Sequence, residues 1–294
     1  MDLAERLIAT GVKFSHIVSI HPDHKAVAQI AGYSDYTSFS ERHGIPIHYA
    51  RDYGLGHEDD LDFFREQRFD LLVQGGWQRL FPTTMLNTLK IGAIGVHGSS
   101  DFLPKGRGRS PMNWSILEGR ERFILSLFLM EPGADDGPVF DFEMYDINAY
   151  DTIRTLYYKL VLATERMILR NLDALLEGRV SPVEQTGEPT YYTKRTPKDG
   201  RIDWELLDVQ DVHRAVRAQT RPYPGAFAQI DGRWVRIWTA QIFDTRLVFP
   251  GKPYGAIVAR FGTDLVINCR GGLLLVTETE DIAGIEFSTL GIEA

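Results

Sequence analysis

Apolar residues along the first 180 positions alternate between two patterns. Short apolar runs typical of buried strands occupy residues 15–20, 45–49, 69–73, 90–96 and 123–130. Between and after them, apolar residues recur at helical spacing over residues 3–9, 34–43, 58–67, 111–118 and 151–177. Strands that alternate with helices in this way are typical of a sheet covered by helices on its faces. The pattern therefore predicts an α/β fold of Rossmann-like type with a mostly parallel sheet.

The last hundred residues follow a different pattern. Residues 235–238, 255–258, 265–268 and 273–276 are short β-rich runs separated by Gly and Pro. This arrangement favours a small all-β domain, and we expect a barrel. Residues 182–198 combine Pro, Gly, Thr and charges without periodicity, which is typical of a linker. We therefore predict a first domain over residues 1–181, a linker over 182–198 and a second domain over 199–294.

Composition narrows the classes of function. The 294 residues are 44% hydrophobic and carry a net charge of -8, which suits a soluble globular protein and disfavours a nucleic-acid partner. Cys269 is the single cysteine, so an intramolecular disulfide and a cysteine-based zinc site are excluded, and the histidine spacing indicates no other metal site. The sequence shows neither a bilayer-spanning run nor the pattern of a signal peptide. We expect a cytoplasmic protein with no membrane partner.

Two glycine-rich segments carry the candidate chemistry. Residues 95–108 read Gly-Val-His-Gly-Ser-Ser-Asp-Phe-Leu-Pro-Lys-Gly-Arg-Gly, and residues 133–138 read Gly-Ala-Asp-Asp-Gly-Pro. The strand over 90–96 would bring His97 to its C-terminal end, and the strand over 123–130 would bring Asp135 to the same edge, where ligand crevices of α/β sheets lie. A protonated His can stabilise an oxyanion, and a neighbouring carboxylate can relay a proton. The structural alternatives are a core histidine and a solvated Gly-Asp turn; for Asp136 we expect the solvated turn.

The two segments together resemble the N10-formyltetrahydrofolate-dependent formyltransferases. The hallmark of that family is an Asn-x-His-Gly-Ser...Leu-Pro-x-x-Arg-Gly segment followed by a Gly-x-Asp-x-Gly loop. The resemblance places His97 and Asp135 on the catalytic positions and implies N10-formyltetrahydrofolate as co-substrate, without a metal. Residues 201–204 and 212–227 are similar to the start of the family's C-terminal domain, which implies that the second domain is an OB-like barrel.

Three departures from the family pattern matter. Gly95 stands where the family has its catalytic Asn, and the stretch after His97 is two residues longer than the usual form. Backbone N–H groups near Gly95 or Gly98, or the side chain of Asn113 or Ser99, would have to replace that Asn; otherwise the chain is a weak or inactive relative. Asn113, a secondary catalytic candidate, also suits a capping or solvated role. The family's first strand and glycine turn are missing before the first helix, through a truncated start or a rebuilt sheet.

Two further groups of residues are predicted to bind substrates. The loop after residues 69–73 occupies the place where the family binds folate, although a Gly-Gly turn after a strand is also ordinary loop chemistry. The predicted folate contacts are Gly75, Gly76, Trp77, Gln78, Arg79, Leu80, Phe81 and Ala134. The predicted substrate contacts beside His97 are Ser99, Lys105, Arg107 and Arg109. Their cations could bind a folate glutamate tail or a nucleotide pyrophosphate, but charge runs are more often solvated surface.

Residues 221–227, Arg-Pro-Tyr-Pro-Gly-Ala-Phe, resemble a segment of formyltransferases that act on nucleotide-linked amino sugars. The resemblance implies N-formylation of such a sugar in bacterial surface-polysaccharide biosynthesis. Methionyl-tRNA enzymes carry a related segment, so tRNA formylation stays open, as do formylation on a peptide synthetase and a non-catalytic folate- or nucleotide-binding relative. The sequence names neither the sugar nor the nucleotide, and it leaves a homodimer open.

Overall fold

The computed structural model describes residues 1–27, 30 and 33–282, and the chain divides into two compact units. The first unit comprises Met1–Gly108, Ile124–Tyr145 and Lys159–Tyr191, and the second comprises Arg109–Phe123, Asp146–Tyr158 and Tyr192–Ala294. Residues 109–123, which the sequence places within the first domain, thus cluster with the C-terminal part of the chain. Each unit is described by itself.

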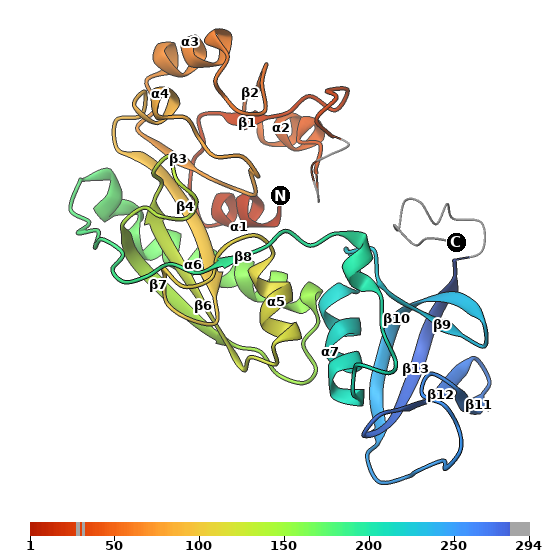
Figure 1. Cartoon of the computed structure of the whole chain (residues 1–294). Coiled ribbons are helices and arrows are strands. Elements are labelled where there is room, and N and C mark those ends of the chain that lie inside the picture. Colours follow the sequence, from red (N-terminus) through yellow and green to blue (C-terminus); the bar gives the residue numbers. More distant parts are fainter. Residues whose placement is uncertain (28–29, 31–32, 283–294) are drawn as a thin grey trace. The chain divides into compact units, whose positions relative to one another are not determined.

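The first unit contains nearly every helix and strand that the apolar pattern predicts (Figure 1). In chain order, its elements are α1 (Asp2–Ala9), β1 (Ile17–Ser19), α2 (Thr37–His43), β2 (Ile47–Tyr49), α3 (Glu58–Gln67), β3 (Leu71–Val73), α4 (Thr83–Leu86), β4 (Gly92–Ser99), β5 (Arg107–Gly108), β6 (Arg122–Leu129), β7 (Val139–Asp146), α6 (Ile153–Leu176) and β8 (Tyr191–Tyr192). The pattern does not predict α4, β5, β7 or β8, and β6, β7, α6 and β8 extend into the second unit. The boundaries of α3 agree with the prediction because His57 accepts a hydrogen bond from the Asp59 amide and Arg68 ends the helix in a left-handed conformation.

Strand direction differs from the prediction. β3 runs parallel to β4, but β6 runs antiparallel to β4, with His97 opposite Ser126. The sheet of order β3-β4-β6-β7 is therefore mixed, and the prediction of a mostly parallel sheet is wrong for this part of the fold. An apolar run indicates that a strand is buried but not which way it runs, because direction depends on how the connecting segment returns.

The other parallel pair, β1 with β2, forms a separate two-stranded sheet. Within the described residues β1 pairs only with β2, and β3 pairs only with β4. Both pieces nevertheless pack on one core: Val18 of β1 and Leu72 of β3 contact a cluster of buried side chains that includes Phe64 and Met85. Burial of this common cluster holds the two sheets in one unit.

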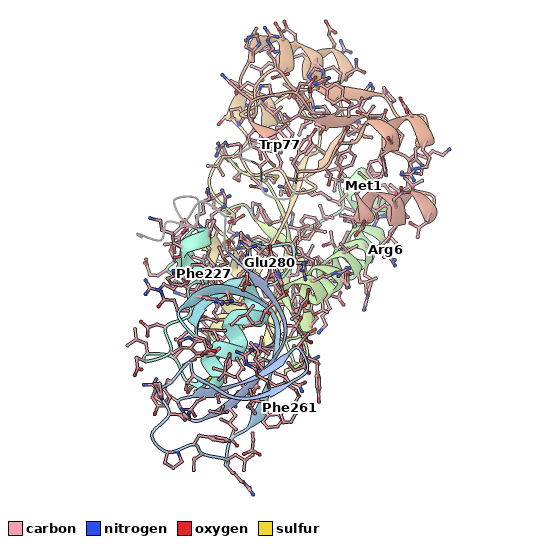
Figure 2. The ribbon with its side chains drawn as sticks, turned by 90° about the vertical axis from the view of Figure 1, so that its right-hand side faces the viewer. Met1, Arg6, Trp77, Phe227, Phe261 and Glu280 are labelled. Carbon is pink, nitrogen blue, oxygen red and sulfur yellow. The ribbon has the colours of Figure 1, made fainter. Side chains whose placement is uncertain are left out.

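Helix α1 is attached to this unit through an apolar side chain and through charged ones. Leu7 is buried, and the Arg6 guanidinium donates to the Glu165 carboxylate of α6 at 2.6 Å. Figure 2 shows Arg6 on this helix. No helix within residues 1–27, 30 and 33–282 is both long and apolar enough to cross a membrane.

The second unit combines helices with an antiparallel sheet. Its elements are α5 (Pro111–Leu117), the 3-10 helix η2 (Pro197–Gly200), α7 (Val209–Gln219), β9 (Ala226–Ile230), β10 (Arg233–Asp244), β11 (Ile257–Phe261), β12 (Asp264–Cys269) and β13 (Gly272–Asp281). The five strands follow the order β11-β12-β13-β10-β9, so β11 and β9 are edges and the described strands form an open sheet rather than the predicted closed barrel. Val212 and Val216 of α7 complete its core.

Candidate active site

His97 lies inside strand β4, which continues to Ser99, and not after the end of the strand as the sequence suggests. Its side chain is 8% exposed. The Nε2 atom lies 2.8 Å from the carbonyl oxygen of Gly106. Because a carbonyl oxygen only accepts hydrogen bonds, Nε2 carries a proton and donates a hydrogen bond to the carbonyl oxygen of Gly106. One ring nitrogen is therefore held by the backbone, and Nδ1 is the nitrogen that faces Asp135.

Asp135 provides the carboxylate of the site. Its Oδ2 lies 3.4 Å from His97 Nδ1, so the two side chains form an ion pair when the imidazole ring is protonated. The same oxygen accepts a hydrogen bond of 3.0 Å from the Gly108 amide. The Asp135 backbone has a φ of 53°, in the left-handed region that costs a residue with a Cβ about 1 kcal/mol. The structure thus brings the two predicted catalytic residues together, His97 from strand β4 and Asp135 from a loop whose backbone is strained at that residue.

The loop around Asp135 requires its glycines. A Cβ on Gly137 would stand 1.7 Å from the carbonyl oxygen of Leu129, and a Cβ on Gly133 would stand 1.8 Å from Oδ2 of Asp136. Asp136 therefore folds back over Gly133, and its Oδ1 is buried with no hydrogen-bond partner among the described residues. This corrects the expectation of a solvated turn at Asp136, because the tight return of the loop turns that side chain inward.

The loop reaches His97 by a route that the sequence does not predict. Because β6 is antiparallel to β4, β6 ends with Leu129 opposite Ile94, three positions before His97 on β4. The prediction that both strands end at one edge is therefore wrong. Residues 130–138 instead run back to His97 before β7 begins. The pair forms through the return of this loop and not through parallel strands.

The predicted folate loop follows β3, and its glycines are open. No atom that the structure describes lies within 4 Å of the place where a Cβ on Gly75 or Gly76 would stand, and Gly76 has a φ of 98°. A flat ligand can therefore approach this backbone closely. Leu80 is exposed, whereas Phe81 is buried in the core and anchors the loop there. Ala134, predicted to contact folate from the other loop, is half-buried.

Trp77 and Gln78 fix this loop to the segment after β2. The Trp77 indole N–H donates to the Tyr53 carbonyl at 3.1 Å, and the Gln78 amide donates to the Tyr53 hydroxyl at 3.0 Å. The Arg79 guanidinium lies 5.3 Å from the centre of the Tyr53 ring. Figure 2 labels Trp77 on the first unit. Tyr53 therefore positions three consecutive residues of the predicted folate loop.

The basic run beside His97 is engaged by another segment of the chain. Lys105 donates to the carbonyl of Glu188, and Arg107 donates to the Gln185 side chain at 2.7 and 3.2 Å and to the Tyr191 hydroxyl at 3.4 Å. Arg109 belongs to the second unit. Binding of substrate by these cations stays a prediction, but Lys105 and Arg107 already hold residues 185–191 in place.

Gln185 is the residue that sequence reasoning missed. It lies in the segment predicted as a linker, yet its side-chain amide donates to the carbonyl oxygens of Asp135 and Gly137, both at 2.8 Å. Its Oε1 accepts the bonds from Arg107. The same segment forms β8, which pairs with β5, and Val183 bridges to Val139. Nothing in the local sequence signals this role, because Gln185 has no periodic or motif context.

The described residues contain no group of three or more His, Cys, Asp or Glu side chains that could hold a metal ion. The cluster at the site is instead a histidine, a carboxylate and backbone amides. Such a set can stabilise the negative charge that develops on an acyl oxygen and can move a proton from an attacking group to a leaving group.

Comparison with known proteins identifies the family. The formyl transferase family model matches residues 10–172, and the model of the formyl transferase C-terminal domain matches residues 194–287. The chain belongs to the formyl transferase family. It is 27% identical over 265 residues to the bifunctional polymyxin resistance protein ArnA of Wigglesworthia glossinidia brevipalpis. That match covers 90% of this chain and 38% of ArnA, so the chain spans well under half the length of this curated relative.

Two solved structures share the fold. HypX from Aquifex aeolicus, in complex with tetrahydrofolic acid, gives a TM-score of 0.65 at 21% identity over 90% of this chain and 44% of HypX. An N-formyltransferase from Helicobacter canadensis, in complex with folinic acid and dTDP-3-aminofucose, gives a TM-score of 0.65 at 15% identity over 95% of each chain. At these identities the likeness concerns the fold.

Gly95, at the position of the formyltransferase Asn, is surrounded by apolar side chains. A Cβ there would stand 2.8 Å from Cζ of Phe128 and 2.9 Å from Cγ of Met130. A side chain at this position would therefore require Phe128 or Met130 to move. The space behind Gly95 is filled by apolar carbon, and no polar side chain replaces the Asn amide from this direction in the part of the chain that the structure describes.

The two side chains considered as substitutes for that Asn both have structural partners. The Ser99 hydroxyl lies 2.8 Å from the carbonyl of Asp101 and 2.9 Å from the carbonyl of Lys105, and so organises its own loop. Asn113, in the second unit, donates to the carbonyl of Ala218 at 2.7 Å and ties α5 to α7. Their catalytic and substrate-binding roles stay predictions. Backbone amides remain the donors that need no rearrangement of a side chain.

Proposed function

We propose that this chain transfers a formyl group from N10-formyltetrahydrofolate to the amine of a nucleotide-linked amino sugar. The observation that carries the proposal is the contact between His97 and Asp135, on the two motifs that resemble the formyltransferase active site. The Helicobacter canadensis N-formyltransferase, similar over 95% of both chains, supports it because that enzyme was solved with folinic acid and a dTDP-linked amino sugar.

In this reaction the neutral amine attacks the formyl carbon, giving a tetrahedral oxyanion. The bond from that carbon to N10 of the folate then breaks, and the proton that the amine loses passes to N10. We assign His97 to charge stabilisation and Asp135 to holding the ring and relaying the proton. In this structure Nε2–H of His97 donates a hydrogen bond to the Gly106 carbonyl. That hydrogen bond must break, and a new one to the substrate oxygen must form, before this N–H can stabilise an oxyanion.

We further propose that the reaction takes place in the cytoplasm, as a step in the synthesis of a bacterial surface polysaccharide. Within this proposal, residues 1–181 form the catalytic domain and residues 199–294 form an accessory domain. The -8 net charge of the chain supports a small-molecule acceptor over tRNA, because a polyanion gains no overall electrostatic attraction to an acidic protein.

The test is a panel of acceptors with one folate donor. dTDP-, UDP- and GDP-linked amino sugars, methionyl-tRNA and an aminoacyl peptide-synthetase carrier are each incubated with N10-formyltetrahydrofolate, and formylated product is quantified. We expect turnover of a nucleotide sugar, with His97→Asn and Asp135→Asn each lowering kcat at least about 100-fold. Asp136→Asn, in the same loop, is the matched control and should stay active. Turnover of tRNA or the carrier alone would refute the sugar acceptor.

A second candidate function has one observation in its favour. Phe128 and Met130 fill the space behind Gly95, so the amide that the family uses has no equivalent there. This favours a relative that binds folate but transfers formyl groups weakly. Calorimetric binding of 5-formyltetrahydrofolate without turnover of any acceptor would establish this alternative, whereas turnover that depends on His97 and Asp135 would reject it.

A further inference from the structure

A polar pocket lies on the first unit, among the loops that follow β1, β2 and β3. It has a volume of about 370 Å³. Its lining residues are His24, Lys25, Ala26, Asp52, Tyr53, Gly54 and Arg79. Loops at the carboxyl ends of strands are where α/β folds place ligands. This pocket shares Arg79 with the predicted folate loop but is lined by none of the residues around His97.

The walls of the pocket are fixed by contacts inside the protein. Tyr53 is 8% exposed, and its carbonyl and hydroxyl oxygens both accept hydrogen bonds from the loop that carries Arg79. On the other side, Nδ1 of His24 accepts the Ala26 amide at 3.1 Å. A neutral His24 therefore carries its proton on Nε2, which leaves that N–H as a donor. Tyr53 and His24 therefore lose little conformational freedom when a ligand binds.

The pocket contains more positive than negative charge. Arg79 and Lys25 are exposed cations, and no carboxylate within the described ranges forms an ion pair with either of them. Asp52 is the one acidic residue of the lining, and its Oδ2 lies 2.8 Å from where a Cβ on Gly54 would stand, so its carboxylate lies back over the bare α-carbon of Gly54. The Tyr53 ring beneath Arg79 orients the guanidinium.

The cations Lys105 and Arg107, which follow His97 in the chain, already donate hydrogen bonds within the protein, whereas the cations of this pocket donate none to the residues that the structure describes. Lys105 and Arg107 donate to residues 185–191 of the chain itself. An acidic protein that binds an anionic substrate needs local cations without internal acceptors. In the first unit, Arg79 and Lys25 meet that requirement beside a loop predicted to contact a substrate.

We propose that this pocket binds an anionic arm of a substrate, a phosphate or a carboxylate, through Arg79, Lys25 and the Nε2–H of His24. The inference rests on the proposed function, which supplies two sources of such an arm: the diphosphate of the acceptor and the glutamate of the folate. Arg79 donates a planar fork of N–H groups suited to either oxyanion, and Lys25 adds a second charge.

The experiment compares each charged ligand with its uncharged counterpart by titration calorimetry. One pair is UDP and uridine; the other is 5-formyltetrahydrofolate and the primary amide of 5-formyltetrahydropteroic acid, which lacks the glutamate and carries no carboxylate. The proteins are the unmodified chain, the double variant Arg79→Gln/Lys25→Gln and the control Lys90→Gln. Lys90 is an exposed cation of the same unit that pairs with Asp70 instead.

We expect the unmodified chain and Lys90→Gln to bind the charged member of one pair at least about tenfold more tightly, and the double variant to lose that difference. The pair in which this happens identifies the source of the anion. Equal affinity within both pairs for the unmodified chain overturns the inference, and so does a double variant that keeps the full difference. Melting temperatures of both variants equal to that of the unmodified chain would show that the substitutions act on binding and not on folding.

Failure of this inference is distinguishable from failure of the proposed function. If no amine acceptor is formylated but the double variant still loses the charge-dependent affinity, anion binding by the pocket is supported and the proposed formyl transfer is refuted. If formyl transfer proceeds and the double variant retains the charge-dependent affinity, the proposed reaction is supported and anion binding by the pocket is refuted.

Discussion

Gln185→Leu removes the amide that fixes the Asp135 loop while keeping a side chain of similar size. Gln185 donates to the carbonyls of Asp135 and Gly137 at 2.8 Å and accepts two bonds from Arg107. Leucine makes none of these bonds. We therefore expect the loop around Asp135 to lose the contacts that hold it, although His97 itself is untouched.

The magnitude follows from the bonds and from the backbone. Net hydrogen bonds contribute about 1 kcal/mol each, and since Gln185 is half-buried we expect a loss of about 2 kcal/mol in the free energy of unfolding. Asp135 holds a φ of 53°, and release of that strain, worth about 1 kcal/mol, favours other loop conformations. A shift of about 1.4 kcal/mol changes a population tenfold, so kcat should fall about tenfold.

Two assays on the same samples check this prediction. Urea unfolding measures the stability loss, and formyl transfer at saturating folate and acceptor measures kcat. Gln67→Leu is the matched control, because Gln67 is an exposed glutamine at the end of α3 in the same unit. The control should leave both quantities unchanged.

A double-mutant cycle with Asp135→Asn separates positioning from a general loss of structure. If Gln185 acts through Asp135, Gln185→Leu should have little further effect on kcat in the Asp135→Asn background. An equal tenfold loss in both backgrounds would refute the positioning role, and an unchanged kcat in the single variant would refute the whole argument.

Three other predictions concern stability and reactivity. Gly137→Ala should lower the free energy of unfolding by about 3 kcal/mol or more in urea titrations, since its Cβ would stand 1.7 Å from a carbonyl oxygen; a loss below 1 kcal/mol would contradict the tight loop. Burial, with the charges of two neighbouring arginines, lowers the pKa of His213 to about 4. Between about pH 6.5 and pH 4, His213 is therefore protonated in the unfolded chain and neutral in the folded chain, so the free energy of unfolding falls as the pH falls. We expect a loss of at most about 2 kcal/mol, after allowance for the partial exposure of His213. His213→Gln should flatten that dependence, and an identical pH profile would argue against it. Burial raises the pKa of Cys269 to about 12, so a thiol reagent at pH 8 should modify this residue only in urea; rapid reaction of the folded chain would show that the thiol is accessible.

The sequence by itself determined the local elements and the two motifs predicted to be catalytic. The helix at Glu58–Gln67 follows from apolar periodicity and from the residues at its ends, and the apolar run over 90–96 predicts the strand that carries His97, although that strand continues to Ser99. The resemblance to the formyltransferases, which the family comparison confirms, rested on the segments around His97 and Asp135. These features are legible because the residues that cause them are neighbours in the chain.

Tertiary structure alone decided strand direction and the surroundings of the site. The antiparallel pairing of β6 with β4 puts Phe128 and Met130 behind Gly95, and the return of the chain sets Gln185 against Asp135, 50 positions away. Neither contact has a local pattern, because hydrogen bonds and packing between distant segments depend on how the intervening chain is routed. A glutamine in an aperiodic stretch has the same local sequence whether its side chain is solvated or holds the Asp135 loop, and only the burial and partners acquired on folding distinguish the two.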